Sequence, residues 1–190
     1  MRSPPWRMLC LVAIIGSVAG TPLIVHGQSA PTFSPYVDEL GNISIPSDFR
    51  DWHFLGTWVV SNDEDDQPGS KGIHNVYTQP ETVAAFQATG KFPDGAVVIK
   101  ELLKAKTNAM TTGKISFATQ TEGWFIMIKD TQGRYKDNKL WGNGWGWALF
   151  ESGDPTTTVT KSYKSECVAC HVPAKKDDWI YIRGYPTLSP

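Results

Sequence analysis

Two cysteines and a histidine at residues 167–171, in the order Cys-Val-Ala-Cys-His, are the side chains whose types and spacing best suit chemistry. Thiols at the C-x-x-C spacing add across the two vinyl groups of haem, and the histidine that follows ligates the iron. The motif therefore predicts one covalently attached haem c. Cys167 and Cys170 would form the thioether links, and His171 would be the axial ligand of the iron.

Other uses of a C-x-x-C pair fit this sequence less well. A structural zinc site or a four-cysteine iron–sulfur cluster needs four protein ligands, and the third cysteine, Cys10, lies near the N-terminus. A redox-active pair usually follows a buried strand of a βαβ unit, which the polar run over 160–166 does not resemble. A redox or disulfide pair remains the alternative to haem.

The first residues have the pattern of a secretory signal. Arg2 and Arg7 precede an apolar run over 8–20, which predicts a signal peptide over 1–27 with cleavage between residues 20 and 30. A membrane anchor is the less favoured alternative, because glycine and proline interrupt the apolar run. Haem c is attached outside the bacterial cytoplasm, so the signal and the haem motif together predict a periplasmic protein.

The charge balance excludes some classes of function. The chain has 18 basic and 19 acidic side chains and a formal net charge of −1, which becomes −3 once Arg2 and Arg7 are removed with the signal. A mildly acidic protein without a basic stripe is not expected to bind nucleic acid or a membrane surface. Residues 31–190 have the length of a single domain.

The segments before the haem motif predict an antiparallel sheet. Six short runs are rich in aromatic and β-branched residues and bounded by turn-forming residues, as strands are. They lie at 52–60, 73–78, 96–103, 114–118, 124–129 and 145–150. Pro80 and Gly90 delimit one short helix, and two more are expected near Pro46 and around the motif. The predicted fold class is α+β, a mainly antiparallel sheet with a few short helices and C-terminal haem attachment.

This arrangement differs from that of ordinary cytochromes c, which are small helical proteins with a methionine ligand after the haem motif. Here Met110 and Met127 both precede the motif. His53 and His74 are further candidate ligands, although a lone histidine in a strand is more often a packed or surface residue. We therefore expect an iron with an open sixth position, suited to binding or transforming a small molecule.

Several segments resemble the cytochrome P-460 family, over about residues 36–188. The matching parts are residues 89–95, 98–102, the strand that contains Trp52, the haem motif, and the run 178–188. The resemblance implies a c-type haem, a mainly antiparallel sheet, a five-coordinate iron and often a homodimer. In members that oxidise hydroxylamine, a lysine nitrogen is also bonded to the porphyrin rim, and Lys100 matches that lysine.

Lys100 also stands out by its place in the predicted strand. Period-two alternation puts Val98, Lys100 and Leu102 on one face and Glu101 on the other. A packed lysine stem with its ammonium in water would also satisfy the pattern. The resemblance favours the cross-link, because apolar neighbours lower a lysine pKa and free a nucleophilic amine. Glu101 is expected to be solvated or ion-paired.

Other residues of the site are less well defined by the sequence. The resemblance implies a distal carboxylate as base, and the acids nearest upstream of the motif are Glu151, Asp154 and Glu166, none of which matches by motif. Arg183 is expected on the surface, and the alternatives are that it pairs with a haem propionate or faces the distal pocket. The tryptophans of 141–147 are expected to pack in the core or against the haem.

Three functions remain open from the sequence. The leading hypothesis is a periplasmic oxidoreductase that oxidises hydroxylamine and passes electrons to a soluble c-type cytochrome. The alternative is a protein similar to cytochrome c′-beta, which binds nitric oxide at an apolar distal site without the cross-link or turnover. The third is a simple electron-transfer cytochrome, which needs a sixth ligand such as Met110, Met127 or His74.

Overall fold

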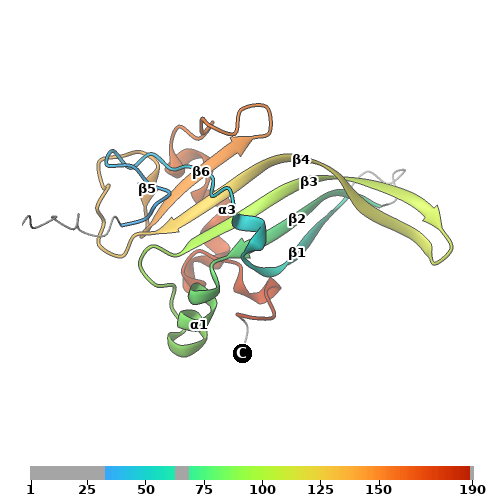
Figure 1. The fold of residues 1–190 in the computed structure, drawn as a ribbon, viewed down its shortest axis with the longest axis horizontal. Coiled ribbons are helices and arrows are strands. Elements are labelled where there is room, and N and C mark those ends of the chain that lie inside the picture. The colour runs from blue at the N-terminus through green and yellow to red at the C-terminus, as the bar shows by residue number, and fades with distance from the viewer. Residues whose placement is uncertain (1–32, 63–68, 189–190) are drawn as a thin grey trace, which may run out of the picture. The chain divides into compact units, whose positions relative to one another are not determined.

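A single antiparallel sheet is the centre of the computed structural model, which describes residues 33–62 and 69–188 (Figure 1). Its strand order is β1-β2-β3-β4-β6-β5. The strands are β1 (His53–Ser61), β2 (Ser70–Thr78), β3 (Val97–Met110), β4 (Gly113–Lys129), β5 (Trp141–Gly142) and β6 (Trp145–Glu151). The predicted α+β class with a mainly antiparallel sheet is confirmed.

The helices are short and lie outside the sheet. They are η1 (Phe49–Asp51), α1 (Pro80–Thr89), α2 (Tyr163–Glu166), α3 (Val168–His171), η2 (Val172–Asp177) and η3 (Ile182–Gly184). Pro80 opens α1, and Gly90 closes it in the left-handed conformation with φ 69°, which glycine adopts without a steric penalty. The predicted helix between Pro80 and Gly90 is confirmed, and the haem motif runs from Cys167, just after α2, through α3.

One strand prediction was wrong. Residues 114–118 and 124–129, predicted as two strands, belong to the single strand β4, which pairs with β3 on both sides of two register shifts at Thr119 and Glu122. The polar Gln120 and Thr121 between them stay in the ladder because Lys104 and Leu103 of β3 are their partners. Gly123 lies inside this strand. A Cβ there would approach the Phe150 carbonyl oxygen to 2.4 Å, so glycine permits close pairing with β6.

Both faces of the sheet are covered. Side chains alternate along the strands, so Val97, Ile99 and Ile126 pack on one face with Phe49 of the N-terminal segment. The opposite face contacts α1 and the C-terminal segment (Figure 1). Its core residues include Val76, Val98, Met127, Trp147, Tyr163, Trp179, Ile180 and Tyr185. We call this second face the motif face, because Cys167 packs there.

Glu101 lies on the face opposite to the motif face. Its side chain is buried and accepts hydrogen bonds from Arg50 Nη2 and, at 3.2 Å, from Thr121 Oγ1. The expected ion pair is therefore present, whereas the carboxylate is not solvated. A buried carboxylate needs such partners because its desolvation is costly.

The Arg50–Glu101 pair leads to a prediction about stability. We expect Arg50→Ala to lower the free energy of unfolding by about 1 kcal/mol, because a buried acceptor loses one of its donors. The effect stays small because Arg50 is mostly exposed and water screens the pair. Urea unfolding measures it, with Arg183→Ala, an exposed arginine outside the sheet, as the control. Equal effects of the two substitutions would contradict the prediction.

The β3–β4 hairpin extends beyond the other strands (Figure 1). β2 pairs with β3 only as far as Lys104, and the residues from Ala105 to Ala118 pair within the hairpin. Lys104, Lys106 and Lys114 are exposed there. Met110 lies at the tip with 48% of its surface exposed.

Within the described residues, no helix combines the length and hydropathy needed to cross a bilayer. The predicted signal peptide over 1–27 lies outside the described residues and stays a prediction.

Candidate functional site

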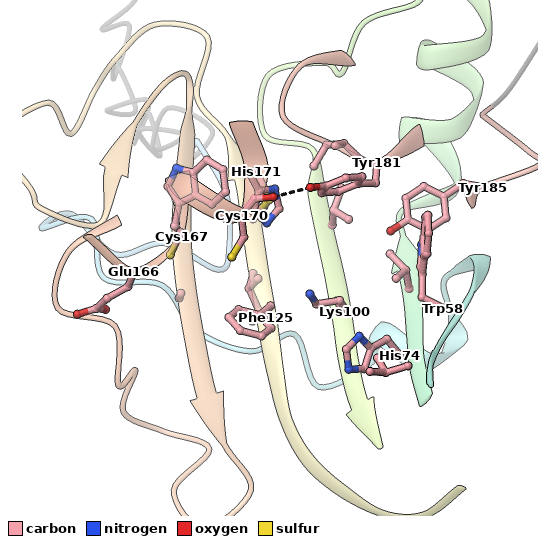
Figure 2. A pocket seen from close by; sticks show the side chains of 18 of the residues that line it. Trp58, His74, Lys100, Phe125, Glu166, Cys167, Cys170, His171, Tyr181 and Tyr185 are labelled. Carbon is pink, nitrogen blue, oxygen red and sulfur yellow. Dashed lines mark hydrogen bonds between the residues drawn. The ribbon is translucent and has the colours of Figure 1, made fainter. Parts of the chain in front are cut away.

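A cavity of about 420 Å³ opens on the motif face, between the strands and the segment that carries the haem motif (Figure 2). Its walls include all four predicted site residues, Lys100, Cys167, Cys170 and His171. The volume falls in the range of about 300–1,000 Å³ that ligand and cofactor pockets occupy. The fold therefore brings a lysine from the middle of the sheet to the C-x-x-C-H motif.

The two cysteines are free thiols, Cys167 at the junction of α2 and α3 and Cys170 within α3. The Cys167 N–H donates to the Tyr163 carbonyl at 3.0 Å, which fixes Cys167 at the end of α2. Cys167 is buried and Cys170 is exposed. Burial raises the pKa of the Cys167 thiol to about 11. A thiol that stays protonated is a poor redox nucleophile, so Cys167 is not activated to attack a disulfide.

His171 is held in one orientation. Its Nδ1 lies 2.7 Å from the Trp179 carbonyl oxygen, and since a carbonyl only accepts, Nδ1 carries the proton and Nε2 keeps its lone pair. Burial lowers the pKa of His171, so the imidazole stays neutral. A neutral ring whose second nitrogen is fixed by a carbonyl is the usual form of a metal-ligating histidine.

A strained turn places the Trp179 carbonyl. Asp178 and Trp179 both have left-handed φ values, 56° and 70°, which non-glycine residues rarely adopt. Lys129 Nζ of β4 contacts the Asp178 carboxylate at 2.7 Å, and Trp145 Nε1 of β6 donates to the Asp178 carbonyl at 3.0 Å. Two strands of the sheet therefore hold the turn that orients His171.

Lys100 points into the cavity (Figure 2). It pairs with Val76 of β2 and with Phe125 of β4, and its Nζ lies 4.5 Å from the centre of the Phe125 ring. Burial lowers the pKa of Lys100, and the nearby Cys170 and Cys167 thiols partly oppose that shift. A desolvated amine beside the motif is more readily neutral and nucleophilic.

The candidate sixth ligands are separated by the fold. Met110 is far from the cavity, at the tip of the β3–β4 hairpin, and His53 does not line it. Met127 and His74 both line the cavity. The pKa of His74 is lowered, first by burial and then by the charge of Lys100.

The carboxylates of the acidic residues near the motif do not point into the cavity. Glu166 lies at its rim, but Oε2 accepts a hydrogen bond from the Lys161 N–H at 2.9 Å, and Figure 2 shows the carboxylate directed away. Glu151 and Asp154 are exposed and do not line the cavity. Asp154 caps a turn by accepting from Thr156 Oγ1 at 2.6 Å.

The sequence missed an aromatic wall of the cavity formed by Trp58, Tyr181 and Tyr185, together with Phe125 (Figure 2). Trp58 meets Tyr185 edge-on, with ring centres 6.2 Å apart, and burial raises the pKa of Tyr185 to about 12. A Cβ at Gly184 would come within 1.9 Å of the Trp58 ring. Gly184 is the one sequence signal of this contact between β1 and the C-terminal segment, because a glycine can mark a place where another side chain approaches the backbone closely.

Two further expectations concern residues near this wall. Arg183 is exposed and does not line the cavity, as expected of a surface arginine. The expected burial of the tryptophans is confirmed, since Trp141, Trp145 and Trp147 are all at most 4% exposed. Of the three, Trp147 reaches the cavity.

The residues of the cavity fit a c-type haem. Free thiols, an oriented neutral imidazole and largely aromatic and aliphatic walls are what such a group needs. In the part of the chain that the structure describes, no three His, Cys, Asp or Glu side chains gather to hold a bare metal ion.

The fold and the cavity together define a β-sheet haem protein of the cytochrome type. The family model for cytochrome P-460 matches residues 46–182, so the chain belongs to the cytochrome P-460 family. The match includes the strands of the sheet, Lys100 and the whole haem motif, and family membership implies a haem cofactor. No curated protein matches the chain significantly. The roles assigned to Lys100, Cys167, Cys170 and His171 stay predictions.

Proposed function

We propose that the protein is an exported c-type haem oxidoreductase that oxidises hydroxylamine at a five-coordinate haem iron, with Lys100 bonded to the porphyrin rim. The position of the Lys100 amine, inside the same cavity as Cys167, Cys170 and His171, carries the proposal. A lysine with only a structural role would keep its ammonium in water, whereas this one is desolvated among apolar side chains.

Each site residue has a definite part in this function. Cys167 and Cys170 would hold the haem by thioether links, and His171 would ligate the iron through Nε2. When bound, the haem supplies an iron that binds a nitrogen ligand and accepts electrons. Trp147 packs edge-on against the His171 ring, with centres 4.9 Å apart, and so restrains it.

Proton removal requires an acceptor near the substrate. His74 lines the cavity, and burial lowers its pKa. A neutral imidazole at this place can take up a proton from hydroxylamine. Glu166 is a poor candidate for this role because its carboxylate already accepts from the Lys161 N–H.

Peptide mapping tests the cross-link directly. Complete proteolysis should give one haem-bearing species that contains both the Lys100 peptide and the peptide with Cys167, Cys170 and His171. Lys104→Ala, which changes an exposed lysine of the same strand, is the matched control and should give the same species. Recovery of a haem peptide without Lys100 would contradict the proposal.

A second candidate function has one observation in its favour. No carboxylate of the described residues points into the cavity, and the wall from β1 and β2 includes the apolar Val59, Val60 and Val76. Such a lining suits a protein similar to cytochrome c′-beta that binds nitric oxide without turnover. Tight nitric oxide binding together with an unmodified Lys100 would favour it.

Coordination distinguishes both functions from a simple electron carrier. We expect the ferrous protein to be high-spin and five-coordinate. Met127→Leu and His74→Gln should leave the visible spectrum of the ferrous protein in its five-coordinate form. Sharp low-spin bands that either substitution removes would identify a sixth ligand and support the carrier instead.

This proposal also includes a periplasmic location and a soluble c-type cytochrome as electron acceptor. It further includes the homodimer that the family resemblance implies. N-terminal sequencing of the mature protein should place its first residue between 21 and 31.

A further inference from the structure

A second pocket, of about 390 Å³, lies next to the haem motif but outside the cavity. It is formed by residues 136–139, before β5, and 162–164, at the start of α2. Lys136, Lys139 and Lys164 line it and are exposed, against a single carboxylate, Asp137. The local charge is therefore positive in a protein whose formal net charge is −1. We call it the lysine pocket.

Tyr163 connects the lysine pocket to the core. It lines the pocket, yet only 9% of its surface is exposed. Its N–H donates to the Lys139 carbonyl at 3.0 Å, which ties the two pocket segments together. A Cβ at Gly142 would come within 2.0 Å of the Tyr163 hydroxyl oxygen, so the glycine lets the tyrosine ring lie flat against β5.

Trp147 continues the connection to the cavity. Its ring stacks on that of Tyr163, with centres 6.3 Å apart and planes 15° apart. It also meets the His171 ring, with centres 4.9 Å apart and planes at 82°. The indole N–H donates to the Gly142 carbonyl at 3.1 Å, which fixes the ring between its two neighbours. An unbroken series of packed rings thus runs from the lysine pocket to the predicted iron ligand.

We infer that the lysine pocket is where electrons leave the protein, and that its partner is a one-electron acceptor protein with a carboxylate-rich face. Electron transfer falls steeply with distance and is favoured by a closely packed medium, which Tyr163 and Trp147 provide. Positive charge around the exit steers an acidic partner to it. In each encounter the haem iron passes from ferrous to ferric, the acceptor gains one electron, and no bond or proton changes place.

The inference rests on the proposed haem site, but it does not depend on hydroxylamine as substrate. The test therefore uses haem-loaded protein that is reduced chemically and freed of reductant. A Lys100 without a cross-link would overturn the proposed function and leave the electron exit standing. A protein without a haem spectrum would overturn both.

Anion binding shows where a negatively charged acceptor docks. Hexacyanocobaltate(III) is a redox-inert trivalent anion, and its titration into ¹⁵N-labelled haem protein should shift amide resonances of residues 136–139 and 162–164. Charge reversal at Lys136, Lys139 and Lys164 should abolish these shifts. Shifts that gather instead at the β3–β4 hairpin or at the mouth of the cavity beside Trp58 would overturn the assignment.

Kinetics with the redox-active analogue ferricyanide test the charge. The triple substitution K136E/K139E/K164E should slow oxidation of the ferrous protein about tenfold at low salt, and the effect should fade at high salt. The matched control is K104E/K106E/K114E, which makes the same change of charge on the hairpin. If the two triple variants slowed oxidation equally, the change in net charge alone would explain the slower rate. The assignment of the lysine pocket as the docking site would then be wrong.

Substitution of Tyr163 tests the aromatic connection. Tyr163→Phe keeps the ring and should oxidise at the wild-type rate, whereas Tyr163→Leu removes it and should slow oxidation severalfold. Both variants should keep the visible spectrum and the pattern of hexacyanocobaltate shifts, which verifies that the haem site and the lysine pocket remain intact. An unchanged rate in Tyr163→Leu would overturn the route.

Discussion

Lys100→Ala is expected to abolish hydroxylamine oxidation and to give the protein the visible spectrum of an ordinary five-coordinate haem c. Alanine has no nucleophilic nitrogen, so the bond to the porphyrin rim cannot form, and that bond is one means by which a protein alters the electronics of a haem. The thioether links should survive, because Cys167 and Cys170 are untouched. The spectrum of the ferrous protein and the hydroxylamine-dependent reduction of an added acceptor measure the two effects.

Two other substitutions sharpen this experiment. Lys100→Arg keeps a long cationic side chain, but a guanidinium stays protonated and does not act as a nucleophile, so the same loss is expected. Lys104→Ala should have no effect, since that lysine is exposed on the same strand. Suppose instead that Lys100→Ala keeps its spectrum and loses only about 1 kcal/mol of stability, as an ordinary packing substitution does. Lys100 would then be structural, and the nitric oxide-binding function would be preferred.

The second large effect concerns the thioether links. In a Lys100→Ala background, Cys167→Ala with Cys170→Ala should leave the haem without a covalent bond to the protein. Acidified acetone should then extract the haem, whereas the colour of the Lys100→Ala parent should stay with the protein. The reason is that C-x-x-C thiols provide the remaining covalent attachment in that parent.

His171→Gly is the matched control for the cysteine experiment. It removes the predicted iron ligand but keeps both thiols, so the haem should stay covalently bound while its spectrum changes. If acidified acetone extracted haem from the Lys100→Ala parent itself, Cys167 and Cys170 would not be attachment sites. The redox-pair interpretation of the motif would then return.

Local patterns singled out four residues, Lys100, Cys167, Cys170 and His171, that the fold brings to one cavity. The C-x-x-C-H order depends only on neighbours in the chain, and the alternation in β3 correctly separated Lys100 from Glu101, because strand periodicity is a local property. The same alternation could not show that Glu101 is buried, since burial there depends on Arg50 and Thr121 from other elements. Sequence periodicity assigns a face but not what covers it.

Contacts between distant segments could not be predicted in the same way. Trp58 and Tyr185 form one wall of the cavity although they come from β1 and the C-terminal segment. Glu166 was a candidate base by proximity to the motif, but a hydrogen bond from the Lys161 N–H turns its carboxylate away. The continuous β4 was missed because its polar middle takes its structure from its pairing with β3 rather than from its own propensity.

The order of the site residues along the chain has a consequence for biosynthesis. All strands of the sheet precede α2 and α3, so the wall that carries Lys100 is synthesised before the haem motif. A domain folds as a unit, and Trp179, Ile180 and Tyr185 from the end of the chain complete the core of the motif face. We therefore expect Lys100 and the two thiols to come together only when the whole domain folds. Haem would have to meet the thiols before or during that step, and the lysine bond would form only once the folded sheet brings Lys100 to the haem.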